Sequence, residues 1–591
     1  MPELRLLRRT VDYVGLSKPS LPHDADRTGD YGTAVARMHG AETEVGPLNR
    51  LETLQMRRIR LFGTTASLLV LVGSLGTGMV PVLQNPIVGT RVLSLPSRMY
   101  STALTISISG AVMLVVAWML LGRFAVGRLR VEVAEGRSPA RRMTRGQTDR
   151  TLLMWVAPLV IAPPLLSKDV YSYLAQSAIA YRGMDPYTYS PMRGLGVDHP
   201  LTLSVPNLWK DTPAPYGPLF LWIGEHITAI TGDNIAAAVL LHRLVAICGV
   251  LMIVWALPRL ARRCGVSAVA ALWLGALNPL LILHLVGGIH NESLMIGMML
   301  VGMEWCFAAI YGAADLLRHD RPWLPSSAGW LLAAGAAMIA ASSMIKVTSL
   351  MALGFVGIAL ARRWRADLPA LRHAPLREWW SRIRQPLAAV SAAAATTGVI
   401  AVMVILAICL GTGLGFGWTG TLSTGGIVRS WMSMPTLLSV VSGRIGLWLG
   451  MGEQTQAILD TARPIGQLIA GVFVVRWLLA TLAGRIQPIG ALGIAMATFV
   501  LFFPFVQAWY LLWAVIPLAA WATTAWFRVG TVLISGIIAI VVMPTSSDTS
   551  PLVVAQGLAT GIAIVAVAGM VFFIDSPVRS WLRRRRSAAA R

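Results

Sequence analysis

The sequence predicts an all-α polytopic membrane protein. Of its 591 residues, 55% are hydrophobic and only 13% are charged, and its mean hydropathy is +0.65. Soluble domains carry roughly 25% charged and about 45–50% apolar residues. In addition, apolar runs of about 15–25 residues recur along the chain, which is the length that crosses roughly 30 Å of hydrocarbon as a helix. These observations exclude a soluble enzyme, a disordered protein and a collagen-like fibre.

The N-terminal segment 1–56 is polar and mixed in charge, and it contains no long apolar run. We expect it to be a flexible cytoplasmic tail. The first long apolar run begins near Leu61, so no signal peptide is expected. A membrane domain is predicted over 57–574, followed by a basic cytoplasmic C-terminus, 575–591.

Hydropathy predicts about 14 membrane-spanning helices in the membrane domain. Their ranges are 61–83, 100–122, 151–166, 235–257, 268–287, 291–317, 328–345, 347–361, 387–411, 461–481, 489–505, 509–526, 530–544 and 553–574. The segment 215–232 is also apolar, but counting it would put Arg262 on the outer side and Glu225 deep in lipid. We therefore expect this segment to be a helix that dips into the outer face.

Positive charge dominates the sequence, with 50 Lys and Arg against 27 Asp and Glu and a formal net charge of +23. The excess forms short clusters between apolar runs, at Arg57-Arg58, Arg141-Arg142, Arg262-Arg263, Arg362-Arg363 and Arg583 to Arg586. This is the pattern of the positive-inside rule, in which basic residues collect in cytoplasmic loops. It predicts a multi-pass plasma-membrane protein with both termini in the cytoplasm. The expected partner is the lipid bilayer, with no nucleic acid.

The two long loops on the opposite side, 167–234 and 412–460, are rich in Tyr, Trp, Pro and Gly. We expect short amphipathic surface helices in these loops, which would cover a cavity between the spans. In the first loop, Val170, Leu174 and Ala178 recur at helical spacing after Asp169. Asp169 either caps this helix or serves as a functional carboxylate.

Further polar residues fall on the same predicted side. His290, Asn291 and Glu292 form a return between two spans, without the paired histidines of a zinc helix. Lys346 lies between two apolar runs, where it either reaches to the interface or binds an anion.

The second long loop and the later returns add cations and aromatic residues: Arg429, Arg444, Trp431, Gln507, Trp509 and Tyr510. Glu304 and Arg243 lie inside predicted spans, where they are either functional or paired with each other or with the backbone. Carboxylates beside aromatic rings suit a sugar, and cations suit a phosphate. The pattern indicates transfer of a sugar from a lipid phosphate at the membrane surface.

Several motifs carry a family resemblance. They are S-K-D-V-Y-S-Y-L-A-Q (167–176), Y-R-G-M-D-P-Y (181–187), T-P-A-P-Y-G-P-L (212–219), G-G-I-H-N-E-S-L-M (287–295), I-K-V-T-S-L (345–350) and L-P-S-R-M (95–99). Together they resemble the GT-C glycosyltransferases. More narrowly, they resemble the actinobacterial polyprenol-phosphate-mannose-dependent α-1,6-mannosyltransferases that build the mannan core of lipomannan and lipoarabinomannan.

The resemblance implies a GT-C fold with an extracytoplasmic active site. It implies an inverting transfer of mannose from β-linked polyprenyl-phosphate mannose to a hydroxyl of a lipid-anchored mannan, with Asp169 as the general base. The implied donor phosphate-binding residues are Lys346, His290, Arg429 and Lys168, although an Arg is expected in place of Lys168. The implied sugar and acceptor residues are Glu292, Asn291, Tyr173, Tyr216, Gln507, Trp509 and Tyr510. No metal is expected to be obligatory.

Two alternatives remain at this stage. A lipid-linked-sugar flippase would also have many helices and charged groups such as Glu304 and Arg243 within them, but the two halves show no inverted repeat. A GT-C enzyme that uses another donor sugar, such as arabinofuranose or glucose, would have similar aromatic residues.

Overall fold

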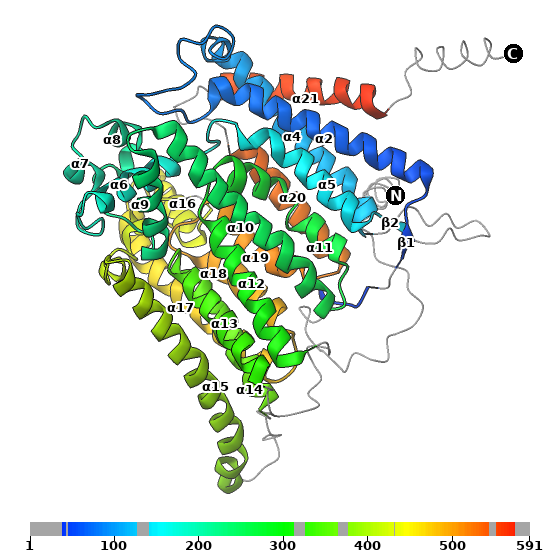
Figure 1. Ribbon diagram of the computed structural model, residues 1–591, viewed down its shortest axis with the longest axis vertical. Helices are drawn as coiled ribbons and strands as arrows, with labels where there is room; N and C mark the ends of the chain where they lie inside the picture. Colours follow the sequence, from blue (N-terminus) through cyan, green and yellow to red (C-terminus); the bar gives the residue numbers. More distant parts are fainter. Residues whose placement is uncertain are drawn as a thin grey trace, which may run out of the picture.

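The computed structural model describes residues 38–42, 45–126, 141–312, 326–364, 376–430, 432–542 and 551–573. Within these ranges the secondary structure is helical apart from two short parallel strands, β1 (Gly46–Pro47) and β2 (Arg141–Arg142). The long helices pack into one bundle, and α6 to α9 gather at one side of it (Figure 1).

The helices are α2 (Arg50–Thr77), α3 (Leu95–Arg98), α4 (Tyr100–Val126), α5 (Arg145–Val156), η2 (Ala157–Val160), α6 (Asp169–Tyr181), α7 (Pro191–Gly194), α8 (Pro200–Ser204), η3 (Asn207–Trp209), α9 (Pro218–Thr231), α10 (Ile235–Arg263), α11 (Ala268–Leu274), the π-helix η4 (Leu281–Gly287), α12 (Glu292–Tyr311), α13 (Ser326–Ser343), η5 (Val347–Leu350), α14 (Met351–Arg363), α15 (Leu376–Gly411), η6 (Gly417–Thr419), η7 (Thr424–Ile427), α16 (Met434–Trp448), α17 (Thr455–Leu482), α18 (Pro488–Phe502), η8 (Ala508–Tyr510), α19 (Leu511–Ala519), α20 (Ala525–Val541) and α21 (Pro551–Phe573).

Six helices are long and apolar enough to cross a membrane, within the ranges described above: α2, α4, α10, α12, residues Arg384–Gly411 of α15, and α17. Five shorter apolar helices accompany them: Ala328–Ser343, Pro488–Phe502, Ala508–Ala519, Ala525–Val541 and Gly557–Gly569. These helices identify a membrane protein. The total of 14 crossings stays a prediction.

Two of the predicted spans are interrupted. Residues 151–166 contain the end of α5 and the short helix η2, with Pro158 at the start of η2. Residues 268–287 contain α11 and then a π-helix, separated by residues 275–280, which include Asn278 and Pro279. The side-chain amide oxygen of Asn278 accepts the backbone N–H of Leu280 at 3.0 Å, and proline has no N–H to continue a helix. Local backbone structure therefore interrupts the helix in two apolar runs that hydropathy predicted to be single spans.

The predicted tail is shorter than expected, because part of 1–56 is packed into the fold. Helix α2 begins at Arg50, after a capping box formed by Asn49 and Glu52. Ahead of it, the Glu42 carboxylate lies 2.7 Å from Arg528 Nη1 and 3.6 Å from Arg142 Nη2. This pairing of buried charge fixes the segment against the bundle. Residues 1–37, like 574–591 at the other end, lie outside the described residues.

Helix α6 covers the predicted range, but the prediction of a surface helix was wrong. Every residue from Val170 to Ala180 is buried, because α7, α8, α9 and α10 pack around this helix. The segment predicted to dip into the membrane, 215–232, contains α9, which packs directly against α6. The first long loop is thus a folded layer of short helices over the ends of the bundle (Figure 1).

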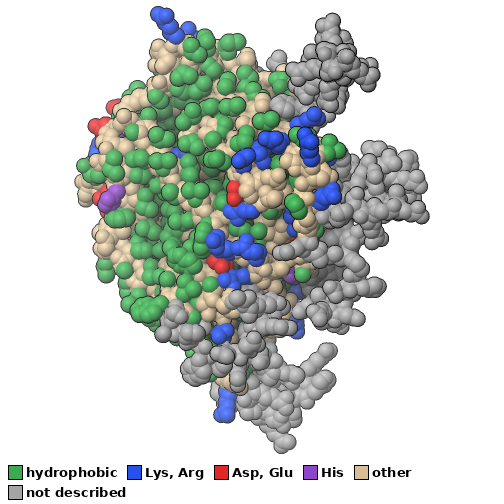
Figure 2. Space-filling view, turned by 45° about the vertical axis from the view of Figure 1, so that its right-hand side comes forward, with side chains coloured by type: hydrophobic (Ala, Val, Ile, Leu, Met, Phe, Trp, Pro, Cys, Tyr) green, Lys and Arg blue, Asp and Glu red, His purple; other side chains and the backbone are tan. Residues whose placement is uncertain are grey.

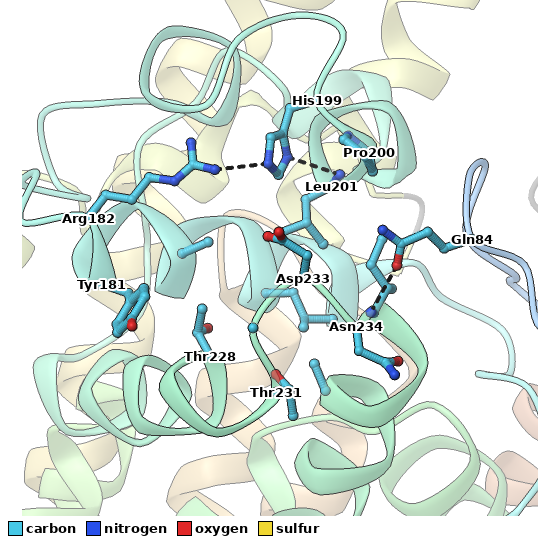
Figure 3. Close-up of a pocket in the computed structure, with 15 residues that line it drawn as sticks. Gln84, Tyr181, Arg182, His199, Pro200, Leu201, Thr228, Thr231, Asp233 and Asn234 are labelled. Atoms are coloured by element: carbon cyan, nitrogen blue, oxygen red, sulfur yellow. Dashed lines mark hydrogen bonds between the residues drawn. The ribbon is translucent and has the colours of Figure 1, made fainter.

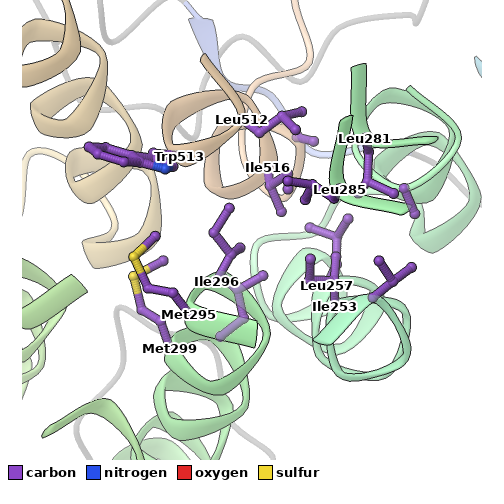
Figure 4. Close-up of a cluster of buried hydrophobic side chains, with 14 of the residues drawn as sticks. Ile253, Leu257, Leu281, Leu285, Met295, Ile296, Met299, Leu512, Trp513 and Ile516 are labelled. Atoms are coloured by element: carbon purple, nitrogen blue, oxygen red, sulfur yellow. The ribbon is translucent and has the colours of Figure 1, made fainter. Parts of the chain in front are cut away.

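The core of the bundle is filled by aliphatic and sulfur-containing side chains from α10, η4, α12 and α19 (Figure 4). Leu257, Leu281, Met299 and Ile516 are among these buried residues. Burial of such side chains excludes water from the bundle interior, and their interdigitation fixes how the helix ends meet.

Different side chains occupy the two ends of the bundle. At one end, Arg263 donates a hydrogen bond to the carbonyl of Gly312 at 2.8 Å, and Arg363 donates one to the carbonyl of Ile310. The ends of α10, α12 and α14 therefore meet there. Glu292 begins α12 at its other end, about 28 Å away at 1.5 Å per residue. Figure 2 shows Lys and Arg side chains gathered toward one side of the molecule, beside a broad hydrophobic surface.

Close packing of α2 on α4 leads to the first prediction, which concerns Gly110. A Cβ at Gly110 would lie 2.7 Å from the carbonyl oxygen of Ala66 and 2.8 Å from the backbone nitrogen of Val70. Gly110→Ala should therefore destabilise the protein by about 1–3 kcal/mol, despite the higher helix propensity of alanine. Thermal unfolding in detergent measures this effect.

The matched control is Gly398→Ala in α15, where no atom lies within 4 Å of the added Cβ. This substitution should not lower the unfolding temperature. If both substitutions had the same effect, the close approach of α2 and α4 would be contradicted.

Candidate functional site

Polar residues from four separate segments meet at the end of the bundle opposite Arg263. The segments are the start of α6, the turn before α12, the turn before η5, and the turn at η8. They contribute Asp169, His290, Glu292, Lys346, Trp509 and Tyr510. The sequence analysis identified each of these residues, and the fold places them in one cluster, called the Asp169 cluster below.

Asp169 is the first residue of α6 but does not act as its cap. The cap position is occupied by Lys168, and no side chain forms a capping hydrogen bond there. The backbone N–H of Asp169 donates instead to the Ser167 hydroxyl oxygen at 3.1 Å. The Asp169 side chain retains 24% exposure and points into a cluster whose other acidic member, Glu292, is 2% exposed. This carboxylate is therefore not used to cap the helix.

His290 lies directly behind Asp169. Its Nδ1 atom is 3.6 Å from Asp169 Oδ2, and its ring is stacked on Trp509 with the centroids 3.5 Å apart and an interplanar angle of 19°. The side chain is completely buried. Because the stack fixes the plane of the imidazole, His290 restricts where the Asp169 carboxylate can lie.

Strained backbone occurs on both sides of this contact. Leu166 and Ile289 have φ values of 64° and 59°, a conformation that is costly for residues other than glycine. A hydrogen bond of 2.9 Å from Leu165 N–H to the Gly287 carbonyl ties the two strained segments together. Such strain persists where the surrounding structure enforces it, and it is frequent at active sites.

Asp169 and His290 differ in the direction in which their pKa values are shifted. Burial raises the pKa of Asp169 to about 6; the Ser167 hydrogen bond and the Lys346 charge oppose this shift, and the Glu292 charge adds to it. Burial, together with the Lys346 charge, holds the pKa of His290 well below its usual range. At pH 7 the carboxylate is therefore mostly ionised beside a neutral imidazole. A carboxyl group poised near neutral pH is suited to general-base catalysis.

Lys346 has two hydrogen-bond partners in the cluster. Its ammonium group donates to Glu292 Oε1 at 2.5 Å and to the Tyr510 hydroxyl at 2.8 Å, and it lies 4.1 Å from the centroid of the Tyr510 ring. The predicted phosphate-binding cation thus has a carboxylate partner. Its side chain nevertheless retains 21% exposure, and its charge acts on the Asp169 carboxyl group.

An aromatic wall adjoins the cluster. The ring of Tyr173 makes edge contacts with Tyr216 and Phe220, each at a centroid distance of 4.9 Å. The backbone after Tyr216 is fixed to the Lys346 turn, because Gly217 N–H donates to the Ile345 carbonyl at 3.1 Å. A Cβ at Gly217 would collide with the Met344 carbonyl, so this close approach requires glycine.

Three predicted site residues have other surroundings. Arg429 donates a hydrogen bond to Gln456 at 3.0 Å on an exposed surface, and among the described residues it forms no hydrogen bond or ion pair with the Asp169 cluster. Lys168 is partly buried beside Lys210, and burial is the main cause that lowers its pKa. Gln507 is partly exposed and precedes η8, with its carbonyl accepting the Tyr510 N–H. Trp431 lies outside the described residues.

The charged residues inside the spans have structural partners. Glu304 accepts two hydrogen bonds from Arg263, at 2.8 and 2.9 Å. Arg243 donates to the carbonyls of Val160 and Gly287, at 2.9 and 3.4 Å. Arg243 therefore supports the backbone behind the Asp169 cluster, and neither residue forms a polar path across the membrane.

Sequence reasoning missed His284. This residue is fully buried in the π-helix, with its ring 5.5 Å from Trp509 and 6.1 Å from His290. Its only sequence signal was a single histidine in an apolar run. Several buried polar atoms around it have no hydrogen-bond partner among the described residues, so a ligand or water could supply their partners. These atoms are both ring nitrogens of His284 and of His290, Asn291 Nδ2, Glu292 Oε2 and Trp509 Nε1.

The polar atoms of the Asp169 cluster are oxygen and nitrogen atoms, and aromatic rings lie next to them. Among the described residues, no three or more His, Cys, Asp or Glu side chains lie close enough together to hold a metal ion.

Comparison with known proteins gives consistent matches over most of the chain. Residues 60–362 match the family model described as the α-(1→6)-mannopyranosyltransferase N-terminal domain, and residues 435–571 match the MptB C-terminal domain. A probable α-(1→6)-mannopyranosyltransferase of Mycolicibacterium smegmatis is 47% identical, over 93% of this chain and 94% of that protein. An α-(1→6)-mannopyranosyltransferase of Mycobacterium tuberculosis is 48% identical, over 86% of each chain. An archaeal oligosaccharyltransferase from Archaeoglobus fulgidus aligns with a TM-score of 0.29 and 13% identity, over 66% of this chain and 52% of that one.

The ion pair between Lys346 and Glu292 gives the second prediction. Lys346→Met leaves the Glu292 carboxylate buried without its cation, and breaking a buried pair on one side costs about 3–5 kcal/mol. The double variant Lys346→Met with Glu292→Gln should be less destabilised than Lys346→Met alone. Thermal unfolding of the purified variants measures the difference, with the exposed Glu453→Gln as the control. Equal destabilisation by the single and double variants would contradict the coupling.

Proposed function

This chain belongs to the α-(1→6)-mannopyranosyltransferase family, and from that premise we propose that it transfers mannose from polyprenyl-phosphate mannose to a lipid-anchored α-1,6-mannan. The proposed fold is of the GT-C type, and the proposed context is synthesis of the lipomannan and lipoarabinomannan core. The observation that carries the proposal is the partly exposed Asp169 carboxylate. Its pKa is raised to about 6, it contacts the buried His290 imidazole, and the charge of Lys346 acts on it.

The proposed reaction is a single inverting displacement. The hydroxyl oxygen of the acceptor attacks the anomeric carbon of mannose, and the Asp169 carboxylate takes the hydroxyl proton. The bond between the anomeric carbon and the phosphate oxygen breaks, and its electron pair leaves with polyprenyl phosphate. A β-linked donor thereby gives an α-linked product. Phosphate is a good leaving group, so this reaction needs no second carboxyl group as an acid.

Lys346 is the proposed contact for the phosphate. Negative charge grows on the phosphate as its bond to the sugar breaks, and a fixed ammonium group stabilises that charge more strongly in a water-poor site. Glu292 and Tyr510 hold the ammonium group in place before the substrate arrives, at 2.5 and 2.8 Å. Glu292 thus acts through Lys346, rather than as a sugar ligand.

His290 is proposed as a positioning residue. Its complete burial and its stack on Trp509 keep it from acting as a mobile cation for the phosphate. Its neutral ring beside Asp169 orients the carboxylate toward the acceptor hydroxyl. Tyr173 and Tyr216 provide ring surfaces on which the C–H face of a sugar can pack.

The proposed orientation places the Asp169 cluster on the extracytoplasmic side. In support, Arg263 and Arg363 lie at the other end of α12, and basic residues favour the cytoplasmic side. Both termini would then be cytoplasmic. We also propose that the reaction requires no metal ion, because the donor carries a single phosphate and Lys346 is in position to balance its charge.

Mannosyl transfer is tested with purified protein in liposomes, synthetic polyprenyl-phosphate mannose and a short α-1,6-mannoside acceptor. Asp169→Asn should lower kcat by about 10²–10⁴-fold, the usual contribution of a general base, without changing the unfolding temperature appreciably. Asp198→Asn, an exposed carboxylate in the same layer, should retain wild-type activity. Near-normal turnover by Asp169→Asn would refute the base assignment. Movement of a lipid-linked sugar without bond formation would refute the enzyme class.

The pH dependence of kcat/KM provides a second test. Asp169 must be ionised to accept a proton, and its pKa is raised to about 6. Activity should therefore be constant above about pH 7 and fall about tenfold per pH unit well below pH 6. The residual activity of Asp169→Asn should lack this acidic limb. A wild-type profile that is flat between pH 5 and 7, with the protein still folded, would contradict the assignment.

A further inference from the structure

A cavity lies toward the C-terminal end of α6. Its volume is about 320 Å³, which falls within the range of about 300–1,000 Å³ found for small-molecule sites. Its walls are formed by α6, α8, the end of α9 and the start of α10, together with Gln84 from the segment after α2 (Figure 3). It includes Tyr181 and Arg182, two residues of the 181–187 motif that have no part in the proposed reaction.

This cavity is separate from the Asp169 cluster. Leu174 and Ala178 line it from one face of α6. Ala178 follows Asp169 by nine residues, which corresponds to about 14 Å along the helix and about 180° around it. The cavity therefore does not hold the sugar that reacts at Asp169.

Hydrogen-bond donors converge on His199 in this cavity. Arg182 Nη2 lies 3.1 Å from His199 Nε2, and the backbone N–H of Leu201 lies 3.3 Å from its Nδ1. Burial and the Arg182 charge lower the pKa of His199, whereas Asp233 opposes that shift, so the ring is neutral at pH 7. A neutral imidazole accepts at only one nitrogen, and therefore one of the two donors is left for an incoming acceptor.

The opposite wall offers both donors and acceptors. The Gln84 amide oxygen accepts the N–H of Ile235 at 3.3 Å, and the Asn234 amide oxygen accepts a backbone N–H of its own helix, so both amide NH₂ groups remain to donate. The hydroxyls of Thr228 and Thr231 donate to carbonyls of their own helix, so their oxygen lone pairs remain to accept.

Backbone strain also marks this cavity. Gln84 has a φ of 59°. Among the described residues other than glycine, the positive φ values occur at Gln84, Leu166 and Ile289, and the last two flank the Asp169 cluster. The fold thus enforces a costly conformation that turns Gln84 onto the start of α10 at the cavity wall.

The charges favour a neutral ligand. Arg182 and Asp233 carry opposite charges and His199 is neutral, so an anion gains no net attraction here. A ring surface is available at Tyr181, which is 52% exposed. Mixed donors and acceptors beside an aromatic ring suit a polyhydroxylated ligand.

We propose that this cavity binds sugar units of the acceptor that are remote from the reacting hydroxyl. The proposal rests on the proposed function, since it takes the acceptor to be a mannan. Such a site would increase the affinity for long acceptors that extend around α6. The same chemistry would also recognise the sugar headgroup of a glycolipid in the surrounding bilayer, and the experiment separates these two sources.

The first measurement compares an α-1,6-mannooctaose acceptor with the corresponding disaccharide in detergent. The wild-type protein should prefer the octasaccharide in kcat/KM. Thr231→Trp, which fills the cavity, and Asp233→Asn should each lower the ratio of long to short by about 5–10-fold, mainly through KM, the effect of losing one or two hydrogen bonds. Ala229→Trp on the same helix and Asp198→Asn lie outside the cavity, so they should leave the ratio unchanged.

The second measurement is equilibrium binding of mannooctaose, without donor, to full-length Asp169→Asn protein. Binding that Thr231→Trp abolishes supports the cavity, even if the wild-type protein transfers no mannose; in that event the proposed function fails alone. If the octasaccharide does not bind but a mannosylated glycolipid in phosphatidylcholine nanodiscs does, and Thr231→Trp removes that binding, the source is the bilayer. Two results together overturn the proposal. Thr231→Trp leaves the ratio of long to short acceptors unchanged, and it does not weaken the binding of either mannooctaose or the glycolipid.

Discussion

The buried ion pair between Lys346 and Glu292 is the interaction on which the arrangement of this site depends. It joins the start of α12 to the turn before η5, and the Tyr510 hydroxyl adds the turn at η8. A charge at this depth is tolerated only with a partner, so these helix ends must meet in one register. The same contact keeps an ammonium group beside Asp169 before any substrate binds. Stability and the proposed function thus depend on the same contacts.

Asp169 shows the cost of that arrangement. Burial disfavours the charged form of Asp169 and raises its pKa to about 6, so this carboxyl group lowers the stability of the fold as the pH rises through 6. The same raised pKa gives the proposed reaction a base near neutral pH. The strained backbone at Leu166 and Ile289 likewise lowers the stability of the fold. The surrounding bundle, with its dry and closely packed core, provides the stability that permits both features.

The two ends of the bundle carry different sets of polar contacts. The arginines at the ends of α10 and α14 neutralise Glu304 and bond to terminal carbonyls of α12, so they fix helix ends. At the other end, the charged groups of Asp169 and Lys346 are partly exposed. Placing α6 to α9 over the bundle ends buries residues 170–180 of α6 and leaves Asp169 and Tyr181 partly exposed at the two ends of this helix. One face belongs to the Asp169 cluster, and the other lines the cavity at Arg182 and His199.

Composition and hydropathy by themselves determined the membrane class, the positions of the long helices and the residues of the Asp169 cluster, because burial in lipid makes every polar residue in an apolar run conspicuous. Only the tertiary structure decided how those residues pair. Sequence spacing does not reveal that Lys346 contacts Glu292, that His290 is buried behind Asp169, or that Arg429 lies elsewhere. The packed segment around Glu42 and the burial of α6 were also beyond prediction, because both depend on partners distant in the chain. Local patterns report what each segment prefers, whereas long-range contacts decide which polar groups share one space.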